Sequence, residues 1–112
     1  MREIKNDHDL DPVEIVFGTT FTSRYKGKIT EHVVLDVGEE GWFSTAQIMA
    51  IEGVEALGFP GTSKRANIAD IKSVWSKERI IKAMEQYYGG PLYPNMLQAI
   101  DNCSTKPPRI IT

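Results

Sequence analysis

The sequence predicts an α+β fold in which an N-terminal antiparallel hairpin or small sheet packs on three or four short helices. A winged helix-turn-helix is the favoured architecture. Three observations predict this fold. The N-terminal half alternates apolar and polar residues around a Lys-Gly-Lys turn, the later half carries helix caps with apolar residues at helical spacing, and cations concentrate between residues 63 and 82.

The hairpin is the first element we expect. A short strand over residues 13–17 precedes two arms over 21–25 and 29–37, with Lys26-Gly27-Lys28 at the turn. Arg24, Lys26 and Lys28 form a basic tip, which predicts a wing that straddles the DNA backbone or enters the minor groove. The alternative is that charged turns keep a sheet edge soluble.

Helix signals begin after the hairpin. Ser44 is a good N-cap for a helix over 45–51 or on to 57, and residues 58–62 form a turn. Thr62 or Ser63 then caps a helix that reaches Trp75. Its expected apolar stripe is Ile68, Ile71, Val74 and Trp75.

Two further helices complete the predicted fold. Ser76 caps a helix over 77–88, which Gly89-Gly90-Pro91 ends. Pro94 can start a last short helix to residue 101. We expect residues 1–11 to be a flexible acidic leader, 12–102 a single α+β domain, and 103–112 a proline-containing tail or linker.

Length and composition restrict the class of protein. A chain of 112 residues with 41% hydrophobic and 25% charged residues is typical of one folded domain. No apolar run approaches the roughly 20 residues of a membrane span, and no secretory signal is evident. We therefore expect a cytoplasmic protein, nucleoid-associated or in the host cytoplasm if phage-encoded. A homodimer and a further domain following Thr112 are left open.

The net charge of −2 conceals an uneven distribution. Residues 1–57 hold 5 Lys/Arg and 11 Asp/Glu, whereas residues 63–82 hold 6 and 2. An acidic chain with a local basic segment favours an oriented contact with an anionic partner over indiscriminate phosphate binding. Nucleic acid is the expected partner.

The predicted helix from residue 63 is the candidate recognition helix. Arg65 on its outward face can donate to guanine and Asn67 can contact an adenine edge, while Thr62 and Ser63 suit a phosphate at the helix start. Alternatively, this face packs on another helix and its cations are simply solvated. The candidate DNA-binding residues outside the hairpin are Thr62, Ser63, Lys64, Arg65, Asn67, Lys72, Ser73, Lys77, Arg79 and Lys82.

Other chemistry has little support in the sequence. His8, His32 and Cys103 lack metal-ligand spacing, and no nucleophile motif is present. We expect no catalytic residue, metal or cofactor. Aromatic residues are expected mainly in the core, with stacking on single-stranded nucleic acid through Tyr25, Tyr87, Tyr88 and Tyr93 as the alternative.

The run from Trp42 to Ile48, followed by Phe59-Pro60-Gly61-Thr62 and by Trp75, resembles the helix-turn-helix domains of the phage Mu repressor and transposase group. This resemblance covers about a third of the chain. It implies that residues 63–74 form a recognition helix and that the protein recognises DNA in a mobile element.

The sequence therefore predicts a non-enzymatic, sequence-selective double-stranded DNA-binding domain of a phage or mobile-element protein that serves replication, recombination or transcription regulation. The alternative is a protein-binding module, such as a phage inhibitor or adaptor, that works through its acidic N-terminal half. Salt separates the two hypotheses, because phosphate binding weakens steeply as salt rises.

Overall fold

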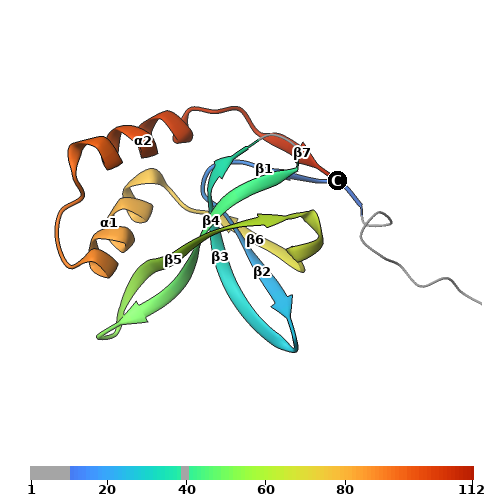
Figure 1. The fold of residues 1–112 in the computed structure, drawn as a ribbon, viewed down its shortest axis with the longest axis horizontal. Helices are drawn as coiled ribbons and strands as arrows, with labels where there is room; N and C mark the ends of the chain where they lie inside the picture. Colours follow the sequence, from blue (N-terminus) through green and yellow to red (C-terminus); the bar gives the residue numbers. More distant parts are fainter. Residues whose placement is uncertain (1–10, 39–40) are drawn as a thin grey trace, which may run out of the picture.

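The computed structural model describes residues 11–38 and 41–112, and strands dominate its fold (Figure 1). In chain order the elements are β1 (Val13–Ile15), β2 (Thr19–Tyr25), β3 (Lys28–Val37), β4 (Trp42–Ile51), β5 (Val54–Lys64), the 3₁₀ turn η2 (Arg65–Asn67), β6 (Asp70–Val74), α1 (Lys77–Tyr88), α2 (Pro94–Ser104) and β7 (Arg109–Ile111).

Antiparallel pairing organises these strands. One five-stranded sheet has the order β5-β4-β3-β2-β6, and β1 pairs separately with β7. The β2–β3 and β4–β5 hairpins close through the two-residue turns Lys26-Gly27 and Glu52-Gly53. All four turn residues have positive φ, as in the type I′ turns that match strand twist. The predicted β2–β3 hairpin is thus confirmed.

Both faces of the five-stranded sheet are covered. Val33 and Val34 are adjacent in β3 and fully buried, so their side chains point to opposite faces and enter different hydrophobic clusters. The first cluster includes Trp75 with residues of α1 and α2. The second joins Phe21 and Phe43 of the sheet to Ile15 of β1 and Ile111 of β7. The helices therefore cover one face and the β1–β7 pair covers part of the other.

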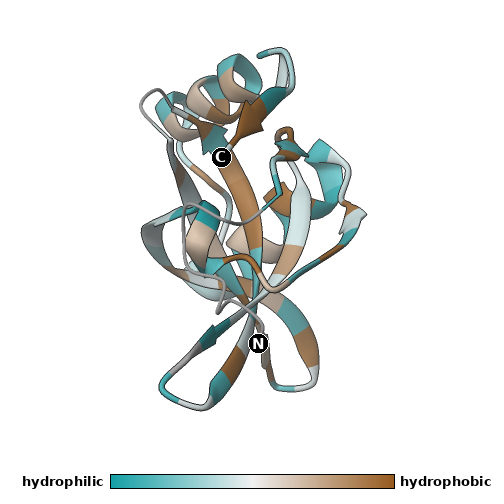
Figure 2. Cartoon of the chain, turned by 90° about the vertical axis from the view of Figure 1, so that its right-hand side faces the viewer, coloured by the Kyte–Doolittle hydropathy of each residue, from teal (hydrophilic) through white to brown (hydrophobic). Residues whose placement is uncertain are grey.

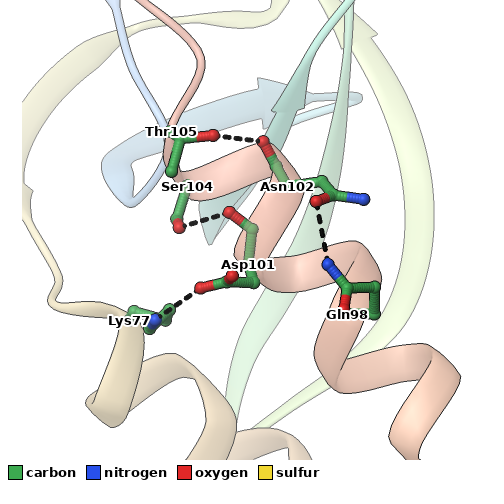
Figure 3. Close-up of polar contacts among 6 residues, drawn as sticks. All are labelled: Lys77, Gln98, Asp101, Asn102, Ser104 and Thr105. Carbon is green, nitrogen blue, oxygen red and sulfur yellow. Dashed lines mark hydrogen bonds and ion pairs between the residues drawn. The ribbon is translucent and has the colours of Figure 1, made fainter.

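The two C-terminal helices follow the predicted signals. Ser76 Oγ accepts a hydrogen bond from Arg79 N at 3.2 Å at the start of α1, which ends at Gly89 with φ of 80°. Pro94 is the first residue of α2. Lys77 of α1 pairs with Asp101 of α2 at 2.7 Å, among several side-chain bonds near the end of α2 (Figure 3).

The predicted helix over 45–57 is wrong, because these residues form most of β4 and the start of β5. β4 lies between β3 and β5, and side chains on both of its faces are buried or half-buried over much of its length. Such a strand lacks clean two-residue alternation, so its apolar residues resemble a helical stripe in sequence. The positive φ of Glu52 and Gly53 then reverses the chain where a helix was expected to continue.

The predicted helix from residue 63 to Trp75 is also wrong. These residues form the end of β5, the η2 turn and β6. Ile68 is buried in the second cluster and Trp75 in the first, whereas Ile71 and Val74 are 43% and 63% exposed. The expected stripe is therefore divided between two cores and solvent. Residues 11–38 and 41–112 contain neither the three-to-four-helix packing nor the winged helix-turn-helix that we predicted, and residues 63–74 do not form the recognition helix that the resemblance implied.

The C-terminal boundary of the domain also differs between the prediction and the structure. Residues 103–112 were expected to be a tail, but they include the end of α2 and strand β7, which pairs with β1. The predicted flexible leader, apart from Asp11, lies outside the described residues.

Candidate functional site

The end of the β2–β3 hairpin, residues 23–30, extends beyond its neighbouring strands. β6 pairs with β2 only from Thr19 to Thr22, and β4 pairs with β3 only from His32 onward. Between these limits the two arms pair only with each other, from Ser23–Thr30 to Tyr25–Lys28. Figure 1 shows this ribbon projecting at the lower end of the molecule, and Figure 2 shows hairpin ends below the rest of the fold from the side. We call it the basic hairpin end.

Charge is concentrated on this ribbon. It holds 3 of the 13 Lys/Arg and none of the 15 Asp/Glu, which leaves a net charge of −5 for the rest of the chain. Arg24, Lys26 and Lys28 are all exposed. Arg24 and Lys28 make no ion pair or side-chain hydrogen bond within residues 11–38 and 41–112. The predicted basic tip is therefore a projecting two-stranded cationic ribbon.

The residues proposed for the start of a recognition helix instead hold a turn together. Ser63 Oγ donates to Asn67 Oδ1 at 3.1 Å, and Lys64 N donates to the same oxygen at 3.0 Å. Arg65 donates from Nε to Asp11 O at 2.7 Å and from Nη1 to Ile68 O at 3.2 Å. These bonds stabilise the passage from β5 through η2 to β6. Thr62 is exposed on β5.

Lys64 lies beside an exposed tryptophan. Its Nζ is 5.8 Å from the centre of the Trp42 ring, and Trp42 is 49% exposed. The two residues face each other across β4 and β5. This cation–π contact can contribute about 0.5–1 kcal/mol at such an exposed site.

The remaining predicted cations fall into two groups, those that form an ion pair with a described residue and those that do not. Lys77 is paired with Asp101, and Arg79 donates to both carboxylate oxygens of Glu55 at 2.9 and 2.7 Å. Lys72 of β6 and Lys82 of α1 are exposed and have no ion pair in the described part of the chain. Ser73 Oγ is 2.9 Å from Thr20 Oγ1 and so helps to join β6 to β2. Three of these residues, Lys77, Arg79 and Lys82, lie on α1 as predicted. Lys72 and Ser73 lie on β6 instead of on a recognition helix.

Two titratable side chains, His32 and Cys103, are partly buried in the fold and have shifted pKa values. Burial lowers the pKa of His32, whose ring stacks on Phe21 with centroids 5.4 Å apart and whose Nε2 is 2.7 Å from Thr30 Oγ1. Burial, and then the charge of Asp36, raises the pKa of the Cys103 thiol, so the nucleophilic thiolate is disfavoured. Among the described residues, no group of three or more His, Cys, Asp and Glu is arranged to hold a metal ion.

A second surface was predicted only in part, because Tyr87, Tyr88 and Tyr93 were named as alternative stacking residues and Phe59 was not. Phe59, Tyr88 and Tyr93 are 61%, 53% and 73% exposed, although we expected Tyr88 at the core. Tyr87 connects Phe59 to Tyr88 through edge-to-face ring contacts. The available signal was the Gly58-Phe59-Pro60-Gly61 run, in which a bulky ring lies between residues that break regular pairing. We call Phe59, Tyr87, Tyr88 and Tyr93 the aromatic surface.

Comparisons with known proteins found no match to this chain. No protein-family model matches the sequence, and neither a curated protein nor a solved structure matches it significantly. Neither α1 nor α2 is long and apolar enough to cross a membrane, and these are the α-helices in the described residues.

Proposed function

We propose that the protein is a non-catalytic module that binds double-stranded DNA through the basic hairpin end. The observation that carries this proposal is the segregation of charge: a projecting ribbon with three cations and no acid belongs to a chain that is otherwise strongly acidic. Such a field orients the ribbon toward a polyanion and directs the acidic remainder away from it.

The shape of the ribbon also supports duplex DNA. The major groove of B-DNA admits a two-stranded β-ribbon, and the arms between Ser23 and Thr30 are free of other strands. Arg24, Lys26 and Lys28 supply phosphate contacts, and Arg24 can also donate to a guanine edge. Lys72, on the strand beside β2, adds a cation near the base of the ribbon. Sequence selectivity would come from the residues of the ribbon rather than from a recognition helix.

The competing protein-binding function through the acidic N-terminal half stays a prediction. Five of the eleven acidic residues in 1–57 are Glu3, Asp7, Asp9, Glu39 and Glu40, which lie outside the described residues. Membership of a phage or mobile element, the process served and a cytoplasmic location are likewise predictions from sequence.

The test is anisotropy of labelled duplex DNA titrated with the protein over a series of salt concentrations. With three cations in contact, we expect the logarithm of the binding constant to fall against that of salt with a slope of about −2 to −3. The double variant Arg24→Gln, Lys28→Gln removes two contacts and should make this slope about 1.8 less steep. Because both side chains are exposed, the far-ultraviolet circular dichroism should not change.

The matched control is Lys82→Gln, which removes an exposed cation from α1, away from the ribbon. It should leave the affinity and the salt slope unchanged. If Lys82→Gln lowered the salt slope by about half as much as the double variant, in proportion to the one charge it removes, only net charge would matter. That result, or an absence of binding at low salt, would refute DNA binding by the ribbon.

A further inference from the structure

The aromatic surface begins at an irregularity in β5. Gln47 of β4 pairs with Gly58 and Thr45 pairs with Gly61, so two β5 residues, Phe59 and Pro60, lie opposite one residue of β4. Phe59 has a φ of 46°, a left-handed conformation that strains a bulky L-residue. The bulge directs the Phe59 ring onto Tyr87 of α1, with centroids 6.2 Å apart. Phe59 therefore keeps a strained backbone although its ring remains 61% exposed.

The surface continues from α1 into a pocket. Tyr87 and Tyr88 meet edge to face with centroids 5.2 Å apart. Tyr88 then lines a pocket of about 590 Å³ together with Tyr93. The other residues of its wall, all in the connection between α1 and α2 or the start of α2, are Gly90, Pro91, Leu92, Pro94 and Met96.

The charges in and around the pocket indicate which class of ligand it would bind. Among the described residues that line it, none is charged. The carboxylate of Glu85 lies beside it, where Oε2 accepts a hydrogen bond from Leu92 N at 3.4 Å. This carboxylate has no ion pair with any described cation. Single-stranded nucleic acid, the alternative considered for Tyr87, Tyr88 and Tyr93, needs cations along its backbone. An uncharged aromatic wall with a neighbouring carboxylate instead favours a cationic, apolar chain.

We propose that the aromatic surface binds an extended, proline-containing peptide segment of a partner protein, with a basic residue of that segment beside Glu85. Proline rings pack flat on exposed tyrosines, and a polyproline II segment loses little conformational entropy on binding because it is already extended. This site is distinct from the basic hairpin end, since its residues belong to β5, α1, the connection between α1 and α2, and the start of α2. The protein would then connect DNA at one surface to a partner at another.

The probes are three fluorescein-labelled hexaproline peptides flanked by arginines, serines or glutamates. A Gly/Ser peptide with the same arginines controls for charge alone. Anisotropy measures affinity, and amide chemical shifts in ¹⁵N-labelled protein locate the binding site. We expect saturable binding of the arginine-flanked peptide, weaker binding of the serine-flanked peptide, and shifts centred on the α1–α2 connection.

Variants assign the contacts. Tyr93→Ala removes a ring that is 73% exposed and should weaken binding about tenfold or more, whereas Tyr93→Phe should retain it. Phe59→Gly removes the second ring and also relieves the positive φ, so loss of affinity without loss of stability is expected. Glu85→Gln should abolish the preference for arginine over serine flanks. Val74→Ala, on exposed β6, is the control and should change nothing.

Any one of the following results would overturn the proposal. The first is that no proline peptide binds more tightly than about 1 mM. The second is that the Gly/Ser peptide binds as well as the proline peptide, or that Tyr93→Ala and Phe59→Gly leave affinity unchanged. The third is a dimer in sedimentation that Tyr93→Ala dissociates, because a second copy would then occupy the surface. None of these outcomes depends on binding of DNA by the ribbon.

Discussion

At the scale of single residues, Gly58 determines how β5 meets α1. A Cβ atom at this position would overlap ring carbons of Tyr87 and lie 2.9 Å from Met49 Sδ. Glycine therefore lets the Tyr87 ring lie directly against the strand. The ring then stays within reach of Phe59, the next residue along β5. A residue without a side chain thus determines the position of two aromatic rings.

We predict that Gly58→Ala lowers the free energy of unfolding by about 1–3 kcal/mol, because the added methyl group must displace packed atoms. Urea denaturation monitored by fluorescence measures the change. The matched control is Gly61→Ala, three residues further along β5, where a Cβ would meet no atom within 4 Å. Equal effects of the two substitutions would contradict the packing of Tyr87 on Gly58.

At the scale of elements, Arg79 joins α1 to β5 and to Trp75, the residue that precedes the N-cap Ser76. Its guanidinium lies 3.9 Å from the centre of the Trp75 ring and donates to both oxygens of Glu55. This hydrogen bonding, opposed by partial burial and aided by the charge of Arg79, holds the pKa of Glu55 below its usual value. The pair is partly exposed, so its contribution to stability is modest.

The lowered pKa of Glu55 predicts the pH range in which the pair contributes. The folded carboxyl stays ionised where the unfolded one begins to protonate, so stability is present above about pH 4.5 and is lost as pH falls through the folded pKa. Glu55→Gln should cost about 0.5–1 kcal/mol at pH 7, and this difference should disappear in acid. Denaturation at pH 7 and pH 3 measures it.

The control for this pair is Glu31→Gln, which neutralises an exposed glutamate of β3 that forms no ion pair with the described residues. It should be nearly neutral at both pH values. A cost of Glu55→Gln that persisted unchanged at pH 3 would show that the charge of Glu55 is not what joins α1 to β5.

At the scale of the whole molecule, two distant parts of the chain complete one core. β1 near the start of the described residues pairs with β7 near residue 112, with Val13 opposite Ile111. Ile15 and Ile111 are 1% and 3% exposed and belong to the cluster that contains Phe21 and Phe43. Closing this face therefore depends on contacts between residues almost a hundred positions apart.

We predict that Ile111→Ala lowers the free energy of unfolding by about 2–4 kcal/mol, because it leaves a cavity beneath the β1–β7 pair. Its neighbour Ile110 is 62% exposed, so Ile110→Ala should change stability by less than about 0.5 kcal/mol. Chemical denaturation compares them. Similar small effects of both substitutions would show that β7 does not complete this core in solution.

The sequence by itself determined the elements that local signals specify. Lys26-Gly27 forms the hairpin turn, Ser76 and Gly89 bound α1, and Pro94 starts α2, because turn and cap geometries depend on a few adjacent residues. The basic tip could also be found, since its three cations are neighbours in sequence.

Only the tertiary structure decided what residues 45–75 become and which surfaces they form. The spacing of Ile68, Ile71 and Trp75 fits a helix, but separate cores on the two sides of the sheet take Ile68 and Trp75 and leave Ile71 exposed. Likewise, only the bulge in β5 brings Phe59 to Tyr87. In the sheet, Ala46, Ala56 and Leu57 are each at most 3% exposed, and this burial overrides the helical periodicity that the sequence displays.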